Sequence, residues 1–451
     1  MARAIAALAV GRGDRVVVWA GTSLDTVPVF AALAKVGAVF APVNAQFGVD
    51  EATEMAGVAK PSLALVDAAH AKEGVELATR LNVEGTAIPD LLSQAASLDD
   101  RDISAPGLSE HDPHVIFFTS GSTGRSKGVV LSHRANYLRT YYGPLLEPKG
   151  PMVCMFPMFH MAPWTIALQV WHSRETIVFV ESADAPSLCE AIERHRATRF
   201  YGIPAVWRRI LDHLSSASAA GTPVPDLSSL RIADTGTSAT PLELLEEIEA
   251  ALPHALLRVF YGSTEAGNVA QLNHADFRRK PGSVGVPAPT AEVRLDDTGE
   301  VLVRGPLLFD GYYDNPEATA EALVDGWYRT GDLAEVDDDG FLTIVGRARD
   351  VIRTGGETVS PSEVEAVLAT CLAVDDVAVV GMPHPDWGEV VCAVVASTTA
   401  PPPTLDDLRR HCEAHLARFK LPQRLELVDA IPRTAATGQV QRRLLVELLT
   451  T

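Results

Sequence analysis

The stretch "TSGSTGRSKG", Thr119–Gly128, follows directly on the apolar run Val115–Phe118. It contains only serines, threonines, glycines and two cations, and residues of these types bury little apolar surface. Glycines allow a close backbone approach, amide and hydroxyl groups donate hydrogen bonds, and Lys127 adds a positive charge. The pattern therefore predicts a strand whose following loop wraps a phosphate chain.

The spacing of this loop differs from that of the Walker-type phosphate loop. G-x-x-x-x-G-K-[ST] requires a hydroxyl residue after the lysine, whereas Lys127 is followed by Gly128. On composition alone the stretch also fits a flexible surface loop. Other motifs of the chain must decide between the two interpretations.

Length, charge and cysteine usage set the broad class. With 451 residues the chain is too long for one compact domain, and we expect two or three. A formal net charge of -20 argues against a non-specific nucleic-acid or anionic-membrane binder. The 5 cysteines are dispersed without CxxC spacing, which is typical of reduced thiols in a cytoplasmic protein. No stretch approaches the roughly 18 apolar residues of a membrane span.

Short apolar runs alternate with helix-like segments over residues 15–70 and again over residues 115–272, which predicts parallel α/β sheets. After Pro281, short strand-like runs separated by Gly, Pro and Asp predict a small β-rich subdomain. Paired strand and helix patterns follow Gly346. We therefore predict a large α/β N-terminal domain, residues 1–346, and a small mobile α+β C-terminal domain, residues 347–451.

Five further motifs occur in an order that, together with the opening loop, resembles the adenylate-forming superfamily. This superfamily includes acyl-CoA synthetases, firefly luciferase and the adenylation domains of peptide synthetases. The motifs are distributed between residues 235 and 365: "TGTSAT" at Thr235–Thr240, "YGSTE" at Tyr261–Glu265, "YRTGDL" at Tyr328–Leu333, "GRARD" at Gly346–Asp350 and "GGETVSPSEVE" at Gly355–Glu365.

The resemblance implies a role for each motif. Thr264 contacts the α-phosphate, Glu265 holds Mg²⁺, Asp332 and Arg347 bind the ribose, and Arg349 occupies the interdomain hinge. The resemblance further implies that the β- and γ-phosphates contact Thr119, Ser120, Gly121, Ser122, Thr123, Gly124 and Lys127. Adenine is implied to contact Gly236, Thr237 and Ser238, and the nucleotide is implied to contact Tyr261, Gly262 and Ser263. The CoA tunnel is implied to be lined by Gly355, Gly356 and Glu357.

The segment "FPMFHMAP", Phe156–Pro163, matches the place where the family has an aromatic and histidine wall beside the acid. His160 is accordingly a candidate for orienting the carboxylate, although a packed core histidine fits equally. Peptide-synthetase adenylation domains carry an Asp here that pairs with the substrate ammonium, and none occurs between Phe156 and Trp164. This disfavours an α-amino acid and favours a fatty or aromatic acid.

Two departures from the family pattern stand out. The catalytic lysine near the C-terminus is replaced by Gln439, which can donate hydrogen bonds but no charge. An engineered Lys→Gln change, an active natural variant and a degenerate enzyme all explain this residue, and Arg442 or Arg443 is a possible substitute. The family also has several dozen residues before "GRGDRV", so the N-terminus looks shortened, and an uncovered sheet edge would favour a homodimer.

The sequence thus predicts a cytoplasmic acyl-CoA synthetase. It would use ATP, Mg²⁺ and CoA to convert a carboxylic acid first to acyl-AMP and then to acyl-CoA. Thr264, Glu265, Lys127, His160 and Gln439 are the candidate catalytic residues. The alternatives are an adenylating enzyme that loads a carrier protein or activates an unusual acid, and an impaired nucleotide- or acyl-binding homologue.

Overall fold

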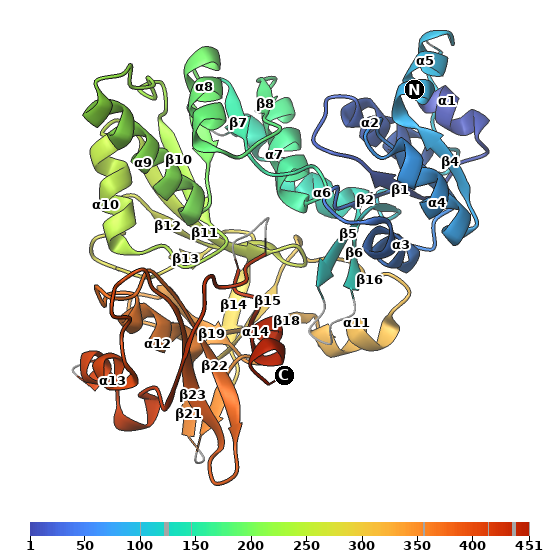
Figure 1. Ribbon diagram of the computed structural model, residues 1–451. Helices are drawn as coiled ribbons and strands as arrows, with labels where there is room; N and C mark the ends of the chain where they lie inside the picture. The colour runs from blue at the N-terminus through green and yellow to red at the C-terminus, as the bar shows by residue number, and fades with distance from the viewer. Residues whose placement is uncertain are drawn as a thin grey trace. The chain divides into compact units, whose positions relative to one another are not determined.

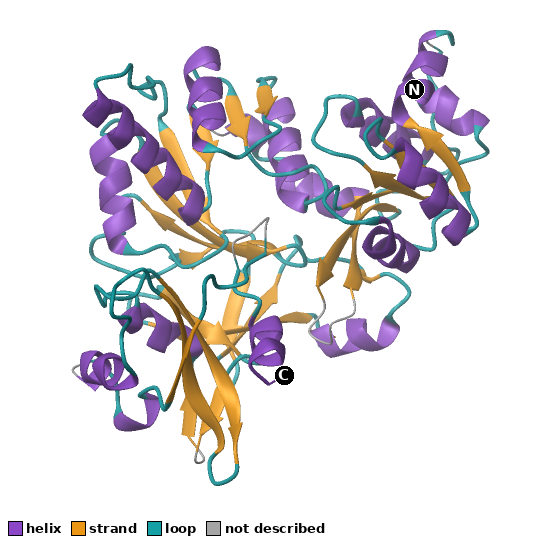
Figure 2. Ribbon diagram, in the orientation of Figure 1, coloured by secondary structure: helices purple, strands orange, loops and turns teal. Residues whose placement is uncertain are grey.

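The structure is a computed structural model that describes residues 1–99, 101–120, 126–145, 147–354, 357–413, 415–434 and 439–450. The chain divides into two compact units, Met1–Glu292 with Val303–Tyr328, and Val293–Leu302 with Arg329–Thr451. Both are mixed α/β (Figures 1 and 2), which confirms the predicted fold class. The domain boundary at 346/347 concerns mobility and stays a prediction. Among the described residues, no helix combines the length and apolar character required to cross a bilayer.

The first sheet of unit 1 has the strand order β16-β6-β5-β2-β1-β3-β4. Its inner strands β1, β2, β3 and β5 are parallel, as the alternating pattern predicts, and β6 returns antiparallel from β5. The elements are α1 (Ala2–Ala7), β1 (Arg15–Trp19), α2 (Thr26–Val36), β2 (Val39–Val43), α3 (Val49–Val58), β3 (Leu63–Val66), α4 (Ala71–Leu81), β4 (Glu84–Ala87), α5 (Ile88–Ala96), β5 (Pro113–Ser120), β6 (Ser126–Ser132) and β16 (Gly311–Tyr312).

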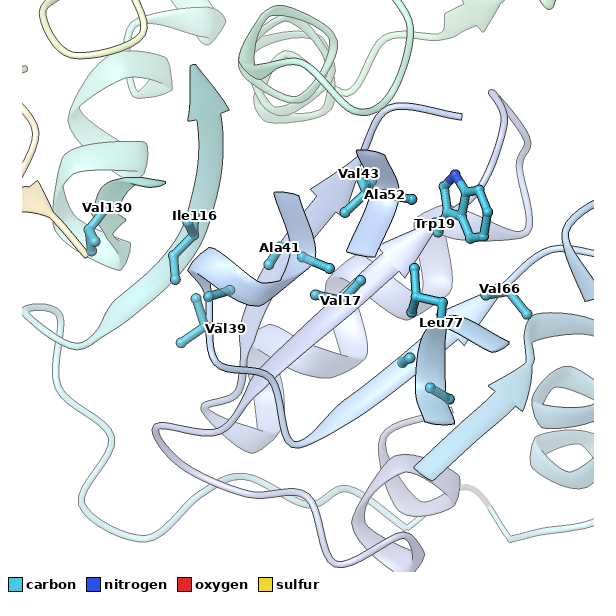
Figure 3. Close-up of a cluster of buried hydrophobic side chains, with 14 residues drawn as sticks. Val17, Trp19, Val39, Ala41, Val43, Ala52, Val66, Leu77, Ile116 and Val130 are labelled. Carbon is cyan, nitrogen blue, oxygen red and sulfur yellow. The ribbon is translucent and has the colours of Figure 1, made fainter. Parts of the chain in front are cut away.

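A continuous apolar core forms on one face of this sheet. Alternate residues of β1 and β2, among them Val17, Trp19 and Val39, are buried against small residues of α3 and against Leu77 of α4 (Figure 3). The same core reaches β5 through Ile116 and β6 beyond it. Strand β5, which leads into the predicted phosphate loop, is therefore held in place by burial of its apolar side chains. Such burial stabilises the fold by roughly 25 cal/mol per Å² of apolar surface removed from water.

The second sheet of unit 1 has the order β13-β12-β11-β10-β9-β7-β8, and β7 to β11 run parallel. Their carboxyl ends lie at one edge, the place where open α/β sheets bind ligands. The elements are α6 (His133–Thr140), η1 (Gly143–Leu145), β7 (Met152–Cys154), α7 (Met161–His172), β8 (Ile177–Phe179), α8 (Ala185–His195), β9 (Arg199–Tyr201), α9 (Pro204–Ala220), β10 (Ile232–Gly236), α10 (Leu242–Ala251), β11 (Leu256–Ser263), β12 (Gly267–Asn273), β13 (Val286–Pro287) and α11 (Pro316–Ala322).

A third, smaller sheet has the order β14-β15-β18-β17, with β19 paired to β18, and confirms the β-rich segment after Pro281. A fourth sheet, in unit 2, is covered by α12 and α13 on one face and by α14 on the other. The elements are β14 (Glu292–Leu295), β15 (Glu300–Arg304), β17 (Leu323–Val324), β18 (Trp327–Val336), β19 (Leu342–Arg347), β20 (Ile352–Thr354), β21 (Glu357–Val359), α12 (Pro361–Leu368), β22 (Asp376–His384), β23 (Gly388–Ala396), α13 (Leu405–Glu413), η2 (Arg418–Lys420), β24 (Arg424–Leu427) and α14 (Arg442–Thr450).

Candidate active site

The predicted adenine segment begins where β10 ends. A Cβ on Gly236 would lie 2.3 Å from the Phe260 carbonyl oxygen and 2.8 Å from the Tyr201 hydroxyl, so only glycine fits there. The next residue, Thr237, has a φ of 68°, a left-handed conformation that is strained for a β-branched side chain. Thr237 and Ser238 are exposed. Such strain is typical of ligand-binding turns, and the adenine contact of this segment stays a prediction.

The "YGSTE" motif forms the turn between β11 and β12. The pairing register shifts between Tyr261 and Gly262, and a Cβ on Gly262 would lie 2.0 Å from the Gly267 carbonyl oxygen. The Ser263 hydroxyl accepts a hydrogen bond of 3.1 Å from the Ala266 amide. These close contacts restrict the backbone of the turn, and the turn in this way sets the positions of Thr264 and Glu265.

Arg139 of α6 is connected to this turn by hydrogen bonds, and no motif in the sequence predicted this role. Its guanidinium is buried and donates to the carbonyl oxygens of Thr264 at 2.9 Å, Glu265 at 3.0 Å and Leu307 at 2.6 Å. Burial lowers the pKa of Arg139 to about 10, so the side chain remains a cation at neutral pH. One cation thus satisfies three carbonyls beside the candidate catalytic residues.

Two of the predicted catalytic residues meet at a tyrosine that the sequence analysis did not single out. The Tyr312 hydroxyl donates to Glu265 Oε1 at 3.0 Å, and Lys127 Nζ lies 4.7 Å from the centroid of the Tyr312 ring. Lys127 is on β6, opposite Thr119 of β5. The loop residues Gly121, Ser122, Thr123 and Gly124 lie outside the described residues, as does the side chain of Ser120.

The geometry of Glu265 fits a magnesium ion whose other ligands are mainly phosphate oxygens. Glu265 is 9% exposed, and its Oε1 atom accepts the hydrogen bond from the Tyr312 hydroxyl. Groups of three or more His, Cys, Asp or Glu side chains able to hold a metal do not occur among the described residues. Mg²⁺ commonly uses one or two carboxylates together with substrate phosphates and waters, so a single glutamate meets its requirement.

His160 lies directly before α7, and its ring centroid is 4.3 Å from that of Phe159. Burial lowers the pKa of His160 to about 4, so the imidazole is neutral at physiological pH. Its Nε2 atom is buried and has no hydrogen-bond partner in the described part of the chain. The geometry is consistent with a neutral side chain that hydrogen-bonds a substrate, and the role stays a prediction.

We expect His160→Gln to lower kcat/KM for the acid by about tenfold, the loss of one hydrogen bond, without changing its pH profile between pH 5 and 8. Because the folded-state pKa lies below the ordinary 6.5, His160 costs stability progressively as pH falls from 6.5 to about 4. The measurement is initial-rate kinetics across that range with His111→Gln, an exposed histidine, as the control. A limb near pH 6.5 that only His160→Gln abolishes would contradict a neutral His160.

Aromatic residues line the carboxyl ends of neighbouring strands. The Tyr201 ring lies 5.3 Å from Phe156 and 5.8 Å from Phe260, between centroids. Asp234 is paired in register with both Tyr201 and Arg258, so these three side chains share one face of the sheet. Arg258 donates two hydrogen bonds of 2.7 Å to Asp234. The sequence analysis did not identify this pair, because it forms only when β10 and β11 align.

In unit 2, the two predicted ribose-binding residues are neighbours. Asp332 of β18 and Arg347 of β19 are paired in register, and Arg347 Nε lies 2.7 Å from Asp332 Oδ1. Glu300, another residue missed by the sequence analysis, accepts a bond of 2.9 Å from the Gly331 amide and so fixes the "TGD" turn. The structure therefore places both candidates together on a rigid pair of strands.

Other predicted residues of unit 2 are exposed. Arg349 lies 3.6 Å from Asp350, and Glu357 opens β21, while Gly355 and Gly356 lie outside the described residues. Gln439 is exposed, and its backbone exchanges hydrogen bonds of 2.8 and 3.1 Å with Thr434.

The arginines that were considered as substitutes for the missing lysine are both paired. Arg442 donates to both oxygens of Glu365, at 2.6 and 2.7 Å, and also lies 3.5 Å from Asp350. Arg443 is exposed and pairs with Glu447 at 2.8 Å. Arg442 is therefore a structural anchor of α14, and this geometry disfavours it as a replacement for the lysine.

Comparison with known proteins identifies the family of the chain. Residues 1–313 match the AMP-binding enzyme family, and residues 363–437 match the AMP-binding enzyme C-terminal domain. The chain belongs to the AMP-binding enzyme family. The resemblance to the adenylate-forming superfamily is thereby confirmed, and family membership makes this AMP-binding enzyme an ATP-dependent, AMP-forming acid–CoA ligase by class.

Individual relatives are similar over almost the whole chain. A 3-[(3aS,4S,7aS)-7a-methyl-1,5-dioxo-octahydro-1H-inden-4-yl]propanoyl:CoA ligase of Mycobacterium tuberculosis is 34% identical, over 99% of this chain and 91% of the relative. A feruloyl-CoA synthase of an Amycolatopsis species is 33% identical, over 98% and 91%. Among solved structures, ATP-bound MatB from Rhodopseudomonas palustris superposes with a TM-score of 0.88 at 27% identity, over 99% and 91% of the two chains.

Proposed function

We propose that this AMP-binding enzyme activates a ring-bearing carboxylic acid with ATP and transfers the acyl group to CoA. In the first step, a carboxylate oxygen attacks the α-phosphorus, and the bond to the β-phosphate oxygen breaks, so that pyrophosphate leaves. In the second step, the CoA thiolate attacks the acyl carbonyl and AMP leaves, while the thiol proton passes to solvent.

The first step joins two anions, so positioning and charge neutralisation supply most of its acceleration. Lys127 would offer a cation to the phosphates, and the Thr264 hydroxyl would donate to the α-phosphate from a turn whose carbonyl oxygens Arg139 binds. Glu265 would hold Mg²⁺, which, when bound, neutralises phosphate charge. Asp332 and Arg347 would bind the ribose hydroxyls, and His160 would orient the acid as a neutral donor.

The proposal of a ring-bearing acid rests on the Asp234–Arg258 ion pair, which lies on the same face of the sheet as Tyr201. The rings of Phe156, Tyr201 and Phe260 form one aromatic cluster at the carboxyl ends of the strands, and we infer that a cyclic acid packs against this cluster. Asp234 lies two residues before Gly236 on β10, so Asp234 and its partner Arg258 lie on the same face of the sheet as Gly236. A long alkyl chain that continued along this face would meet an ion pair and gain little from burial. The two relatives described above are named for ring-bearing acids, which supports the proposal.

An acid panel tests this function directly. Pyrophosphate release is measured with cinnamate-type, indole and alicyclic acids and with octanoate and hexadecanoate, each with and without CoA. We expect at least a tenfold higher kcat/KM for the preferred ring-bearing acid than for hexadecanoate, because hydrophobic pockets discriminate by about 10–200-fold. Equal or higher values for hexadecanoate would reject the ring-bearing class. CoA consumption in the same reactions distinguishes CoA from a carrier-protein acceptor.

One observation favours a second candidate, an impaired homologue that binds nucleotide without efficient turnover. Gln439 stands where the family resemblance places a catalytic lysine, and the nearby Arg442 is bound by Glu365. Tight ATP binding with no pyrophosphate release from any acid of the panel would support this candidate. The Gln439→Lys variant described in the Discussion separates the two.

A further inference from the structure

Tyr312 is attached to the strand that carries Lys127. Strand β16 pairs antiparallel with β6, so that Tyr312 lies opposite Val129. The flanking main chain is fixed as well, because the Tyr313 amide donates to the Gly128 carbonyl at 2.8 Å. Lys127 is two residues before Val129, and side chains two residues apart lie on the same face of a strand. The Tyr312 ring and the Lys127 ammonium therefore meet on one face of the sheet.

The same tyrosine reaches Glu265, which lies in the turn between β11 and β12. Its hydroxyl donates to Glu265 Oε1 at 3.0 Å, and the amide of Phe309 donates to the Glu265 carbonyl oxygen at 2.8 Å. One short segment thus holds both the side chain and the backbone of Glu265. Burial first, and then the charge of Glu265, keep the pKa of Tyr312 above its ordinary value, so the hydroxyl stays protonated at neutral pH.

Tyr312 also stands between two opposite charges that both face the nucleotide in the proposed site. Lys127 has no carboxylate partner among the described residues, and its ammonium lies against the ring face instead. A direct ion pair between Lys127 and Glu265 would leave less of each charge for the ligand. Cation–π attraction holds the lysine without neutralising it.

We propose that Tyr312 is a positioning residue of the nucleotide site. Its hydroxyl orients Glu265 with one carboxylate oxygen left for Mg²⁺, and its ring keeps Lys127 apart from Glu265 and available to phosphate. This inference rests on the proposed nucleotide site, and it adds a residue that acts through its neighbours.

Equilibrium binding of ATP by calorimetry, with Mg²⁺ as the titrated variable and no acid present, tests the proposal. Tyr312→Phe removes the hydroxyl and keeps the ring. We expect the half-saturating Mg²⁺ concentration to rise by about 10- to 100-fold, the loss of a hydrogen bond to a charged group, while ATP binding in EDTA stays unchanged. Tyr312→Leu also removes the ring, and we expect ATP binding in EDTA to weaken by about twofold to fivefold.

The neighbouring Tyr313 gives a matched control. Its ring lies 5.8 Å from the Arg15 guanidinium carbon and packs against the core of the first sheet. Tyr313→Phe should leave the Mg²⁺ dependence as in the native protein. An unchanged Mg²⁺ dependence in Tyr312→Phe, or equal shifts in Tyr312→Phe and Tyr313→Phe, would overturn the positioning role. A native protein that binds no ATP with Mg²⁺ would overturn the nucleotide site itself.

Discussion

Replacing Gln439 by lysine is expected to raise acid-dependent pyrophosphate release by about 10²–10³-fold. A lysine offers a cation to the pentavalent transition state, whereas the glutamine side chain offers only neutral hydrogen bonds, and charge-assisted contacts of this kind contribute several kcal/mol. Gln439 is exposed, so a longer side chain can extend into solvent. The measurement is single-turnover pyrophosphate release with the best acid of the panel.

Thioester formation from supplied acyl-AMP should change little in the same variant, because the adenylation step has then been bypassed. Gln439→Met is the control, since it alters the side chain without adding charge. Arg443→Gln, which removes an exposed cation four residues away, should leave both steps unchanged. Equal first-step rates in native protein and Gln439→Lys would show that this position takes no part in adenylation.

Arg139→Met is expected to cost the protein about 3–5 kcal/mol of unfolding free energy and nearly all ATP-dependent activity. The substitution leaves the carbonyl oxygens of Thr264, Glu265 and Leu307 without their donor, and breaking a buried charged contact is expensive. Urea unfolding and pyrophosphate release measure the two effects. Arg139→Lys should rescue only in part, because one ammonium cannot reproduce the planar fork of donors.

A matched control for this prediction lies on the same helix. Arg134 is exposed and pairs with Glu110 at 3.1 Å, so Arg134→Met should cost less than about 1 kcal/mol. If Arg139→Met and Arg134→Met unfold at the same urea concentration, the network beneath the "YGSTE" turn is not a major source of stability. Loss of activity in a normally stable Arg139→Met variant would assign the residue to positioning alone.

The motifs with special backbone requirements were the parts of the site most accessible from sequence. Gly236 and Gly262 occupy places where a Cβ would meet a backbone atom, and such local constraints leave a readable trace in the residue order. Asp332 and Arg347 were likewise predicted from their motifs, and their ribose-binding role stays a prediction. Their mutual ion pair was not, because it depends on the alignment of β18 with β19.

Residues that act at a distance along the chain escaped prediction. Tyr312 contacts Glu265, although the two residues are 47 positions apart in the sequence. Arg139 also contacts Glu265, at a sequence separation of 126 positions. Neither contact leaves a periodic or compositional signal, because each requires two segments that the sheets bring together. The Asp234–Arg258 pair, 24 positions apart, is a third such case, and our proposal of a ring-bearing acid rests on it.

By itself, the sequence determined the alternation of strands and helices, the family and the motifs that we propose to face ATP, because these depend on local pattern and on residues required at fixed spacing. Only the tertiary structure decided which charges are paired and which remain available. Arg442 is bound by Glu365, while Lys127 rests on the ring of Tyr312. Pairing depends on distance in space, and distance in space is set by how the sheets align.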